Sequence, residues 1–249
     1  MKRILFAMLF VLTAAMVSAG QYENPMLNMT VPSGLENGQT YLEIEHKFSQ
    51  SFYSYPKDDF FAVLNYGSNI KIGLRYMIWE GIEAKIAYIS YHREKTAGIS
   101  YVLKTPQLGF NSQLDVQLLN YQDLNYASPV VQNFFYQLSL QTVPLLDDRV
   151  YLSLDLGYDG YNTNPGMGIG ISVMAIKHLS LLAEYYPVLK AVGNNTTGCF
   201  SFGLKIDTAG HQFIIRLGNS AEIGTRGLMH GTTNQDLFLG FEIMRLISM

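Results

Sequence analysis

The sequence is short of the features that mark several common protein classes. It has one cysteine, Cys199, so it cannot form an internal disulfide and has no disulfide framework. Only 15% of the residues are charged, and a formal net charge of −3 argues against a basic surface of the kind that binds nucleic acid. No stretch rich in proline or serine divides the chain, so its 249 residues predict one domain after the N-terminal region.

Catalytic and metal-binding motifs are also missing. The five histidines lack the spacing of metal ligands, and the nucleophile motif Gly-x-Ser-x-Gly does not occur. His211 and Asn219 lie on one expected strand, roughly 26 Å apart, too far to share a catalytic hydrogen bond. The run from Gly166 to Gly170 lies in an alternating strand with no helix after it, which favours a strand with one small face over a nucleotide-binding loop. We therefore expect no enzyme activity, no metal and no cofactor.

Long apolar runs are absent beyond the N-terminus. Lys2 and Arg3 precede an apolar run at residues 4–17, and Val17-Ser18-Ala19 has the small residues that a signal peptidase needs. The run is shorter than the roughly 20 residues of a membrane helix. We expect residues 1–19 to be a cleaved signal peptide, without a lipid anchor because no cysteine lies beside the cleavage point. Its removal would change the net charge to −5 (−3 − 2).

What the sequence does contain is an alternation of apolar with polar, charged or small residues from Tyr41 to the C-terminus. Residues 200–207, Phe-Ser-Phe-Gly-Leu-Lys-Ile-Asp, are one instance. A period of two predicts strands with one apolar face, and segments of about ten residues with charges on the other face are typical of strands that cross a bilayer around a polar lumen. We therefore expect an all-β fold, an antiparallel up-and-down transmembrane β-barrel of about 12 strands over residues 40–249, after an irregular lead-in at 20–39.

The expected strands lie near residues 40–49, 69–78, 82–91, 96–104, 111–120, 132–143, 149–158, 166–176, 179–187, 198–206, 211–218 and 236–247. Tight turns follow even-numbered strands at 79–81, 146–148, 177–178 and 207–210, whereas longer loops follow odd-numbered strands at 50–68, 121–131, 158–165, 188–197 and 219–235. This asymmetry is typical of bacterial outer-membrane barrels and places both termini on the periplasmic side. The short connection at 92–95 breaks the pattern and leaves the strand count open there.

Alternation also predicts which charged side chains face the lumen. Ile72 and Leu74 would face lipid, which turns Lys71 and Arg75 inward, because a charge on the lipid face costs about 2–4 kcal/mol at the midplane. The same argument gives the candidate lumen-lining residues Glu43, Glu45, Lys71, Arg75, Glu83, Lys85, Asp115, Asp155, Glu184, Lys205, Arg216 and Glu242, with Lys47 and Lys104 as further interior charges. The two signs nearly balance, so each acid can find a base on a neighbouring strand.

The balance of charge leaves two interpretations of the lumen. In one the barrel is filled, with paired charges and with Tyr151 and Tyr186 beside the small Gly168, Gly170 and Ser172. In the other it is a narrow water-filled pore. Twelve strands lie between the eight of a filled barrel and the sixteen or more of an open channel. We favour a filled or narrowly gated lumen, in which the long loops fold in as a lid or face a partner.

Several segments carry a resemblance to a known family. They are residues 179–186, 203–207 and 238–241, together with Gly210-His211-x-Phe213 and Asn219-Ser220, and residues 37–48 match its first strand. In these the chain resembles uncharacterised bacterial outer-membrane-type β-barrels, classed as a domain of unknown function. The resemblance implies an outer-membrane barrel with no established activity, and it supplies no catalytic residue.

The function that we favour is a non-enzymatic pore or transporter of the outer membrane, narrow or gated, that passes small polar solutes as a monomer surrounded by lipid. The alternative is a structural or interaction barrel with a filled lumen, which presents its long loops, the loop at 219–235 above all, to a protein partner. A third hypothesis is a soluble periplasmic barrel that binds an apolar ligand inside. It requires the inverse facing, with Leu237, Leu239 and Phe241 buried and the charges in water. None of the three involves nucleic acid.

Overall fold

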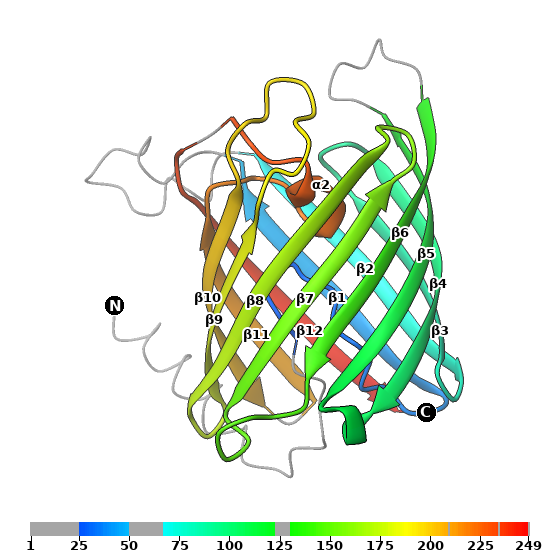
Figure 1. Cartoon of the computed structure of the whole chain (residues 1–249), viewed down its shortest axis with the longest axis vertical. Coiled ribbons are helices and arrows are strands. Elements are labelled where there is room, and N and C mark those ends of the chain that lie inside the picture. The colour runs from blue at the N-terminus through cyan, green and yellow to red at the C-terminus, as the bar shows by residue number, and fades with distance from the viewer. Residues whose placement is uncertain (1–24, 50–66, 123–129, 209, 234, 249) are drawn as a thin grey trace.

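Twelve β-strands form one closed barrel in the computed structural model, which describes residues 25–49, 67–122, 130–208, 210–233 and 235–248 (Figure 1). The strands are β1 (Gln39–Phe48), β2 (Ser68–Trp79), β3 (Ile82–Ile89), β4 (Glu94–Thr105), β5 (Phe110–Gln122), β6 (Val130–Thr142), β7 (Val150–Asp159), β8 (Asn164–Ile176), β9 (Leu179–Tyr186), β10 (Cys199–Thr208), β11 (His211–Gly218) and β12 (Phe238–Ser248). The described residues also contain two short helices, η3 (Pro106–Leu108) and α2 (Thr225–Met229). The predicted fold class and every expected strand are confirmed. The predicted signal peptide lies outside the described residues, as does most of the loops predicted at 50–68 and 121–131.

Each strand pairs antiparallel with its neighbours in sequence, and β1 pairs with β12 to close the barrel. The closing register runs from Gln39 opposite Ser248 to Lys47 opposite Gly240. Since antiparallel neighbours need only a short connection, this up-and-down order follows from strands separated by turns. Closure leaves no free sheet edge, which is required of a β-structure surrounded by lipid.

The two rims of the barrel differ in their connections. One rim, called here the short-turn rim, carries tight turns in which left-handed backbone recurs: φ is +77° at Gly81, +68° at His178 and +85° at Gly210. The opposite rim, called here the long-loop rim, carries the segments at 187–198 and 219–237. The predicted asymmetry is therefore present, and the short connection at 90–93 hides no extra strand.

The long loop predicted at 158–165 is wrong. The pairing of β7 with β8 continues to Asp159 opposite Asn164, which leaves only a turn at 160–163. Asp159 closes this turn by accepting hydrogen bonds from the backbone N–H of Tyr161 (3.0 Å) and of Asn162 (3.1 Å). An aspartate that binds backbone amides beyond it in the chain is a turn-forming residue, whereas the sequence pattern alone had marked this segment only as polar.

The outer wall is apolar and the inner wall is polar. Ile72 and Ile99 expose 52% and 61% of their surface, whereas Glu83 and Asp115 are fully buried. On β12, Phe241 is exposed and Glu242 is buried, which is the opposite of what a soluble barrel with an apolar interior requires. That third hypothesis is wrong.

The prediction for Lys104 is also wrong. This side chain, expected in the interior, is exposed because it lies at the end of β4 beside the short-turn rim. No helix in the described part of the chain combines the length and hydropathy needed to cross a membrane.

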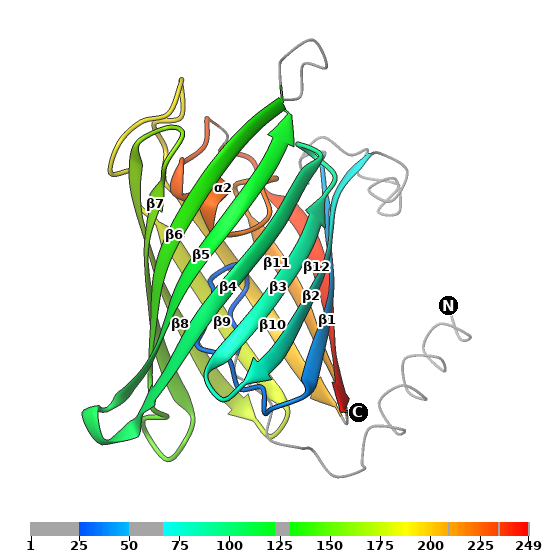
Figure 2. The same ribbon diagram turned by 90° about the vertical axis from the view of Figure 1, so that its right-hand side faces the viewer.

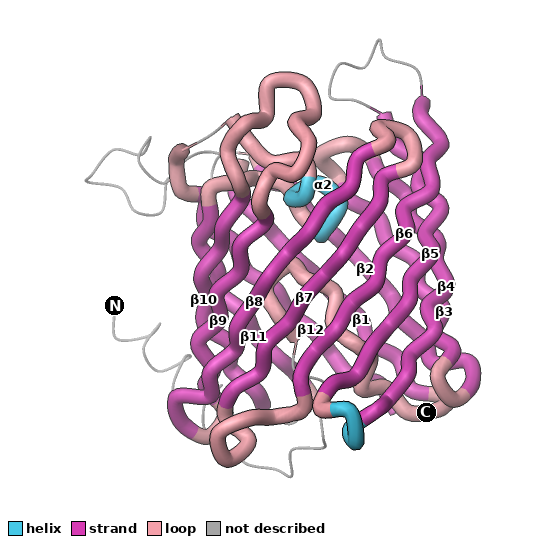
Figure 3. Tube along the Cα trace, in the orientation of Figure 1, coloured by secondary structure: helices cyan, strands magenta, loops and turns pink. Residues whose placement is uncertain are grey.

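Two segments of the chain itself occupy the lumen (Figures 2 and 3). Residues 25–38, called here the inserted segment, lie inside the barrel without regular secondary structure and lead into β1 at the short-turn rim. Residues 219–233, called here the lid, carry α2 and fold into the mouth at the long-loop rim. The two segments share one hydrophobic cluster, in which Leu27 and Met29 join Leu228 and Met229. Near the short-turn rim, Leu35 is buried in a second cluster with Met77 and Met244.

Candidate functional site

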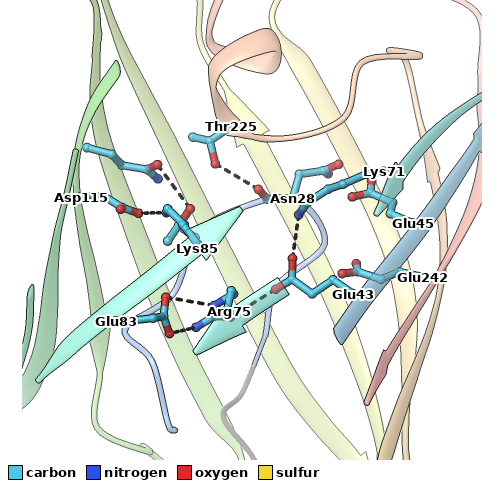
Figure 4. A network of polar contacts seen from close by, with 12 residues as sticks. Asn28, Glu43, Glu45, Lys71, Arg75, Glu83, Lys85, Asp115, Thr225 and Glu242 are labelled. Carbon is cyan, nitrogen blue, oxygen red and sulfur yellow. Dashed lines mark hydrogen bonds and ion pairs between the residues drawn. The ribbon is translucent and has the colours of Figure 1, made fainter. Parts of the chain in front are cut away.

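Charged side chains of β1, β2 and β3 form a connected set of ion pairs on one side of the lumen (Figure 4). The carboxylate of Glu43 lies 2.9 Å from Lys71 Nζ and 3.3 Å from Arg75 Nη1. Arg75 also donates to both carboxylate oxygens of Glu83, at 3.1 and 3.0 Å. The register explains this arrangement, because Glu43 lies opposite Gly73, between Lys71 and Arg75 on the same face of β2.

A further ion pair lies beside this set, on β3 and β5. Lys85 Nζ pairs with Asp115, and the other oxygen of Asp115 accepts a hydrogen bond from Ser100 Oγ at 2.8 Å. Asp115 is fully buried, so these two contacts replace the water that would otherwise solvate its charge.

A second set surrounds Arg216 of β11. Its Nη1 lies 2.5 Å from Glu45 of β1, and its Nη2 pairs with Glu242 of β12. Glu45 and Glu242 are directly opposite each other in the pairing of β1 with β12. Like charges at opposed positions repel, so the guanidinium between them is what allows both carboxylates to stay in the wall.

The inserted segment is held in the lumen through Asn28. Its Nδ2 donates to Glu184 Oε2 at 2.9 Å, and its Oδ1 accepts from Arg216 at 2.9 Å and from Lys47 at 3.2 Å. The backbone oxygen of Asn28 accepts a hydrogen bond from Thr225 Oγ1 of the lid at 3.0 Å. One residue thus joins the inserted segment to the wall and to the lid.

The lid is tied to the wall mainly through Arg226. This side chain pairs with Glu94 of β4, lies 3.4 Å from Asp159 of β7, and stacks over the ring of Tyr121 of β5 at 4.6 Å from the ring centre. The lid backbone adds a hydrogen bond from Lys47 Nζ to the Glu222 carbonyl. The mouth is therefore closed by contacts to strands on several sides of the barrel.

A small cavity remains between the wall, the inserted segment and the lid. Its volume is about 150 Å³, enough for several water molecules. Its lining includes Glu43, Glu45, Lys71, Arg75, Lys85, Asn28, Glu222, Arg226 and Glu242. The site is thus a charged cavity that is bordered by the wall, the inserted segment and the lid.

A histidine of the β3–β4 turn forms an ion-pair contact with the lid. His92, in the turn between β3 and β4, lies 2.9 Å from Glu222 of the lid. Burial disfavours the charged imidazole, but the hydrogen bond and the charge of Glu222, with Glu94 nearby, outweigh it and the repulsion by Arg226, so the pKa of His92 is raised above its ordinary 6.5. Burial likewise opposes ionisation of Glu222, yet the contact with His92 and the charges of Arg226 and Lys47 lower its pKa below 4.5.

We expect the lid to loosen as the pH rises through the pKa of His92. A raised pKa in the folded protein means that the charged imidazole stabilises the closed lid fully below about pH 6.5, and that this contribution is lost above the raised value. Hydrogen–deuterium exchange of the amides at 228–231, corrected for the intrinsic effect of pH, should therefore speed up on going to alkaline pH. His92→Gln should abolish this extra pH dependence and His178→Gln, on the opposite rim, should keep it; equal profiles for the wild type and His92→Gln would contradict the prediction.

The candidate lumen-lining residues lie in different parts of this arrangement. The first ion-pair set contains Glu43, Lys71, Arg75 and Glu83, and the Lys85–Asp115 pair lies beside it. The second set contains Glu45, Arg216 and Glu242. Asp155 and Glu184 instead bind the inserted segment. Lys205 is buried and lies 3.4 Å from Asp207 on the same strand.

Sequence reasoning missed the residues that close the lumen, which are Asn28, Glu94, Asp159, Glu222, Thr225 and Arg226. A signal for the first was present, because Leu27, Met29 and Val31 alternate with Asn28 and Thr30 inside the lead-in. For the lid no comparable period exists. Asn219, weighed above as a catalytic residue, has a structural role, since its amide bonds the backbone of Gly198 and Phe200 at 2.9 and 2.8 Å.

The sequence profile of a family described as "membrane bound beta barrel domain (DUF5777)" matches residues 122–247. No curated protein matches the chain. Among solved structures, a KdgM porin superposes with a TM-score of 0.50 and 10% identity, over 83% of this chain and 98% of the porin. Outer membrane phospholipase A from Escherichia coli has a TM-score of 0.48 and 11% identity over 90% and 94% of the two chains. Omp33 of Acinetobacter baumannii has a TM-score of 0.48 and 10% identity over 84% and 98%. At such identity the porin shares the fold alone.

Proposed function

The chain belongs to the family of membrane bound beta barrel domains (DUF5777), and from this we propose that it is a gated pore for small polar solutes in a bacterial outer membrane. It is exported by its signal peptide and acts as a monomer, without catalysis. The inserted segment and the lid are the closed gate. When they are displaced, water and small solutes pass along the charged inner wall.

The observation that supports this proposal is the charged inner wall around a cavity that the inserted segment and the lid cover. Buried ion pairs are weak evidence for stability, because apolar side chains of similar volume usually fill a core equally well. A barrel that served only as an anchor would need no such wall. Paired charges around a lumen are instead suited to an interior that becomes wet.

The same wall predicts the solute class. Around the cavity, the five carboxylates of Glu43, Glu45, Glu94, Glu222 and Glu242 are nearly matched by the four cations of Lys71, Arg75, Lys85 and Arg226. With the two signs nearly balanced, the open lumen should discriminate weakly between small cations and anions. Its size should set the limit, because twelve strands enclose a lumen between that of a filled barrel and that of a wide porin.

We expect Asn28→Ala to raise the open probability of the pore about tenfold or more. The change removes hydrogen bonds to charged partners, each of which contributes roughly 1.5–3 kcal/mol, and so weakens the hold of Glu184, Lys47 and Arg216 on the inserted segment. Single-channel recording of the purified protein in planar bilayers measures the effect.

Asn194→Ala is the matched control, because Asn194 is exposed in the segment between β9 and β10. It should behave like the wild type.

The shared hydrophobic cluster of the inserted segment and the lid favours the second candidate function, an interaction barrel with a permanently filled lumen. If Asn28→Ala inserts as a folded barrel yet stays electrically silent, as the wild type then also would, the pore is rejected in favour of that candidate.

A further inference from the structure

The contacts of residues 26–33 point to a binding site rather than to an ordinary core. We infer that the inner wall is a peptide-binding site, which residues 26–33 occupy as an intramolecular ligand. The site itself is independent of the proposed function; only its role in closing the lumen rests on that function.

The wall recognises the backbone of this segment. The N–H groups of Asn28 and Met29 both donate to Glu184 Oε1, at 2.8 and 3.0 Å. The N–H of Thr30 donates to Asp155 Oδ2 at 3.0 Å, and that of Ser33 donates to Gln113 Oε1 at 2.9 Å. The acceptors are side chains of β9, β7 and β5, so three strands bind one stretch of main chain, which bends at residues 27–29. Hydrogen bonds to the main chain are one established source of affinity in peptide recognition.

The wall also holds space for the side chains of the segment. A Cβ added at Gly170 would lie 2.5 Å from Met26 Cε and 2.6 Å from Met29 Sδ. A Cβ added at Gly203 would lie 2.4 Å from Leu27 Cδ2. Glycines on the inner faces of β8 and β10 thus leave space for three apolar side chains. Between these side chains, Asn28 forms hydrogen bonds with Glu184, Lys47 and Arg216. Apolar hollows around one specific polar contact give such a site sequence preference.

The segment joins the rest of the chain through an exposed turn. Glu36 and Asn37 are exposed, and Gly38, with φ of +79°, donates its N–H to Met77 O at 3.0 Å where β1 begins. The hydrogen bonds that fix Asn28, Met29, Thr30 and Ser33 go to wall side chains and not to a paired strand. A ligand tethered in this way binds at a high effective concentration, and it becomes an exchangeable peptide once the tether is cut.

The test cuts this tether after the full chain has folded. A specific protease site is inserted between Glu36 and Asn37, the refolded protein is cleaved in detergent, and a fluorescent peptide of residues 25–36 is added. Anisotropy should show saturable binding to the cleaved protein and little to the uncleaved one, where the tethered segment competes. A peptide carrying Leu27→Asp and Asn28→Ala should bind at least tenfold more weakly.

A second variant removes the ambiguity of slow release. If the cleaved segment stays bound, the same assay is run on a protein that carries the protease site together with Asn28→Ala, in which the tethered segment is weakened. Exchange in either protein supports the site. A segment that stays bound in both proteins, no binding after release, or equal binding of the altered peptide, would overturn the inference.

The two proposals fail separately in this system. In planar bilayers, cleavage should raise the current and the added peptide should lower it. Binding of the peptide with no current under any condition keeps the peptide site and rejects the pore. A current that appears after cleavage without any binding of the peptide keeps the pore and rejects the site.

Discussion

Arg216→Met is expected to lower the free energy of unfolding of the barrel by about 3–5 kcal/mol, because it leaves two buried carboxylates without their partner. Arg216 is fully buried, and Glu45 and Glu242 are directly opposed across the β1–β12 pairing that closes the barrel. The repulsion that remains would therefore act at the closing seam. Urea unfolding in lipid vesicles, followed by tryptophan fluorescence and heat-dependent gel mobility, measures the change.

Two comparisons separate the loss of a partner from the loss of a side chain. Arg245→Met, at an exposed position near the end of β12, should change stability by less than about 0.5 kcal/mol. Replacing the whole cluster, with Arg216→Met, Glu45→Gln and Glu242→Gln together, should recover much of the loss, because no unpaired charge is left in the wall. If the triple variant is as unstable as Arg216→Met, repulsion between the carboxylates is not the cause.

The barrel could be predicted from the sequence because alternate residues of a membrane strand face the lipid and the lumen, so the residue types show which face is which. For the neighbours Lys71 and Ile72, only one orientation of the strand keeps the charge away from lipid. The same alternation of apolar and polar residues recurs in the other strands. By the same argument Glu83 and Asp115 face inward, and both are buried in the structure. It failed for Lys104, because alternation predicts which face of the strand a residue lies on but not how close the residue is to the rim of the barrel.

The contents of the lumen could not be predicted in this way. Alternation describes a residue relative to its own strand, whereas Asn28 and Arg226 are placed by side chains from strands more than a hundred residues away in sequence, such as Glu184 for Asn28 and Glu94 for Arg226. Asp159 illustrates the same limit, because one carboxylate both closes a turn and pairs with the lid. The favoured expectation of a filled or gated lumen did not identify the N-terminal lead-in as what occupies it.

Arg226→Ala is expected to raise the open probability of the pore by about 10- to 100-fold. The guanidinium pairs with Glu94 and lies near Asp159, and a hydrogen bond to a charged group contributes roughly 1.5–3 kcal/mol, where every 1.4 kcal/mol or so is a factor of ten. Its loss also leaves two carboxylates near the mouth without this cation, and their charge draws water under the lid. Single-channel recording gives the open probability, and amide exchange at 228–231 reports the lid independently of any current.

The matched control is Arg149→Ala, which removes an exposed guanidinium on the short-turn rim and should alter neither readout. Faster exchange of the lid without a change in current would mean that the lid is not part of the gate.

Combining Arg226→Ala with Asn28→Ala tests whether the lid and the inserted segment open as one unit. They share the Thr225–Asn28 hydrogen bond and one hydrophobic cluster, so either change alone should already loosen both. The double variant should therefore raise the open probability by less than the product of the two single effects, whereas independent gates would multiply.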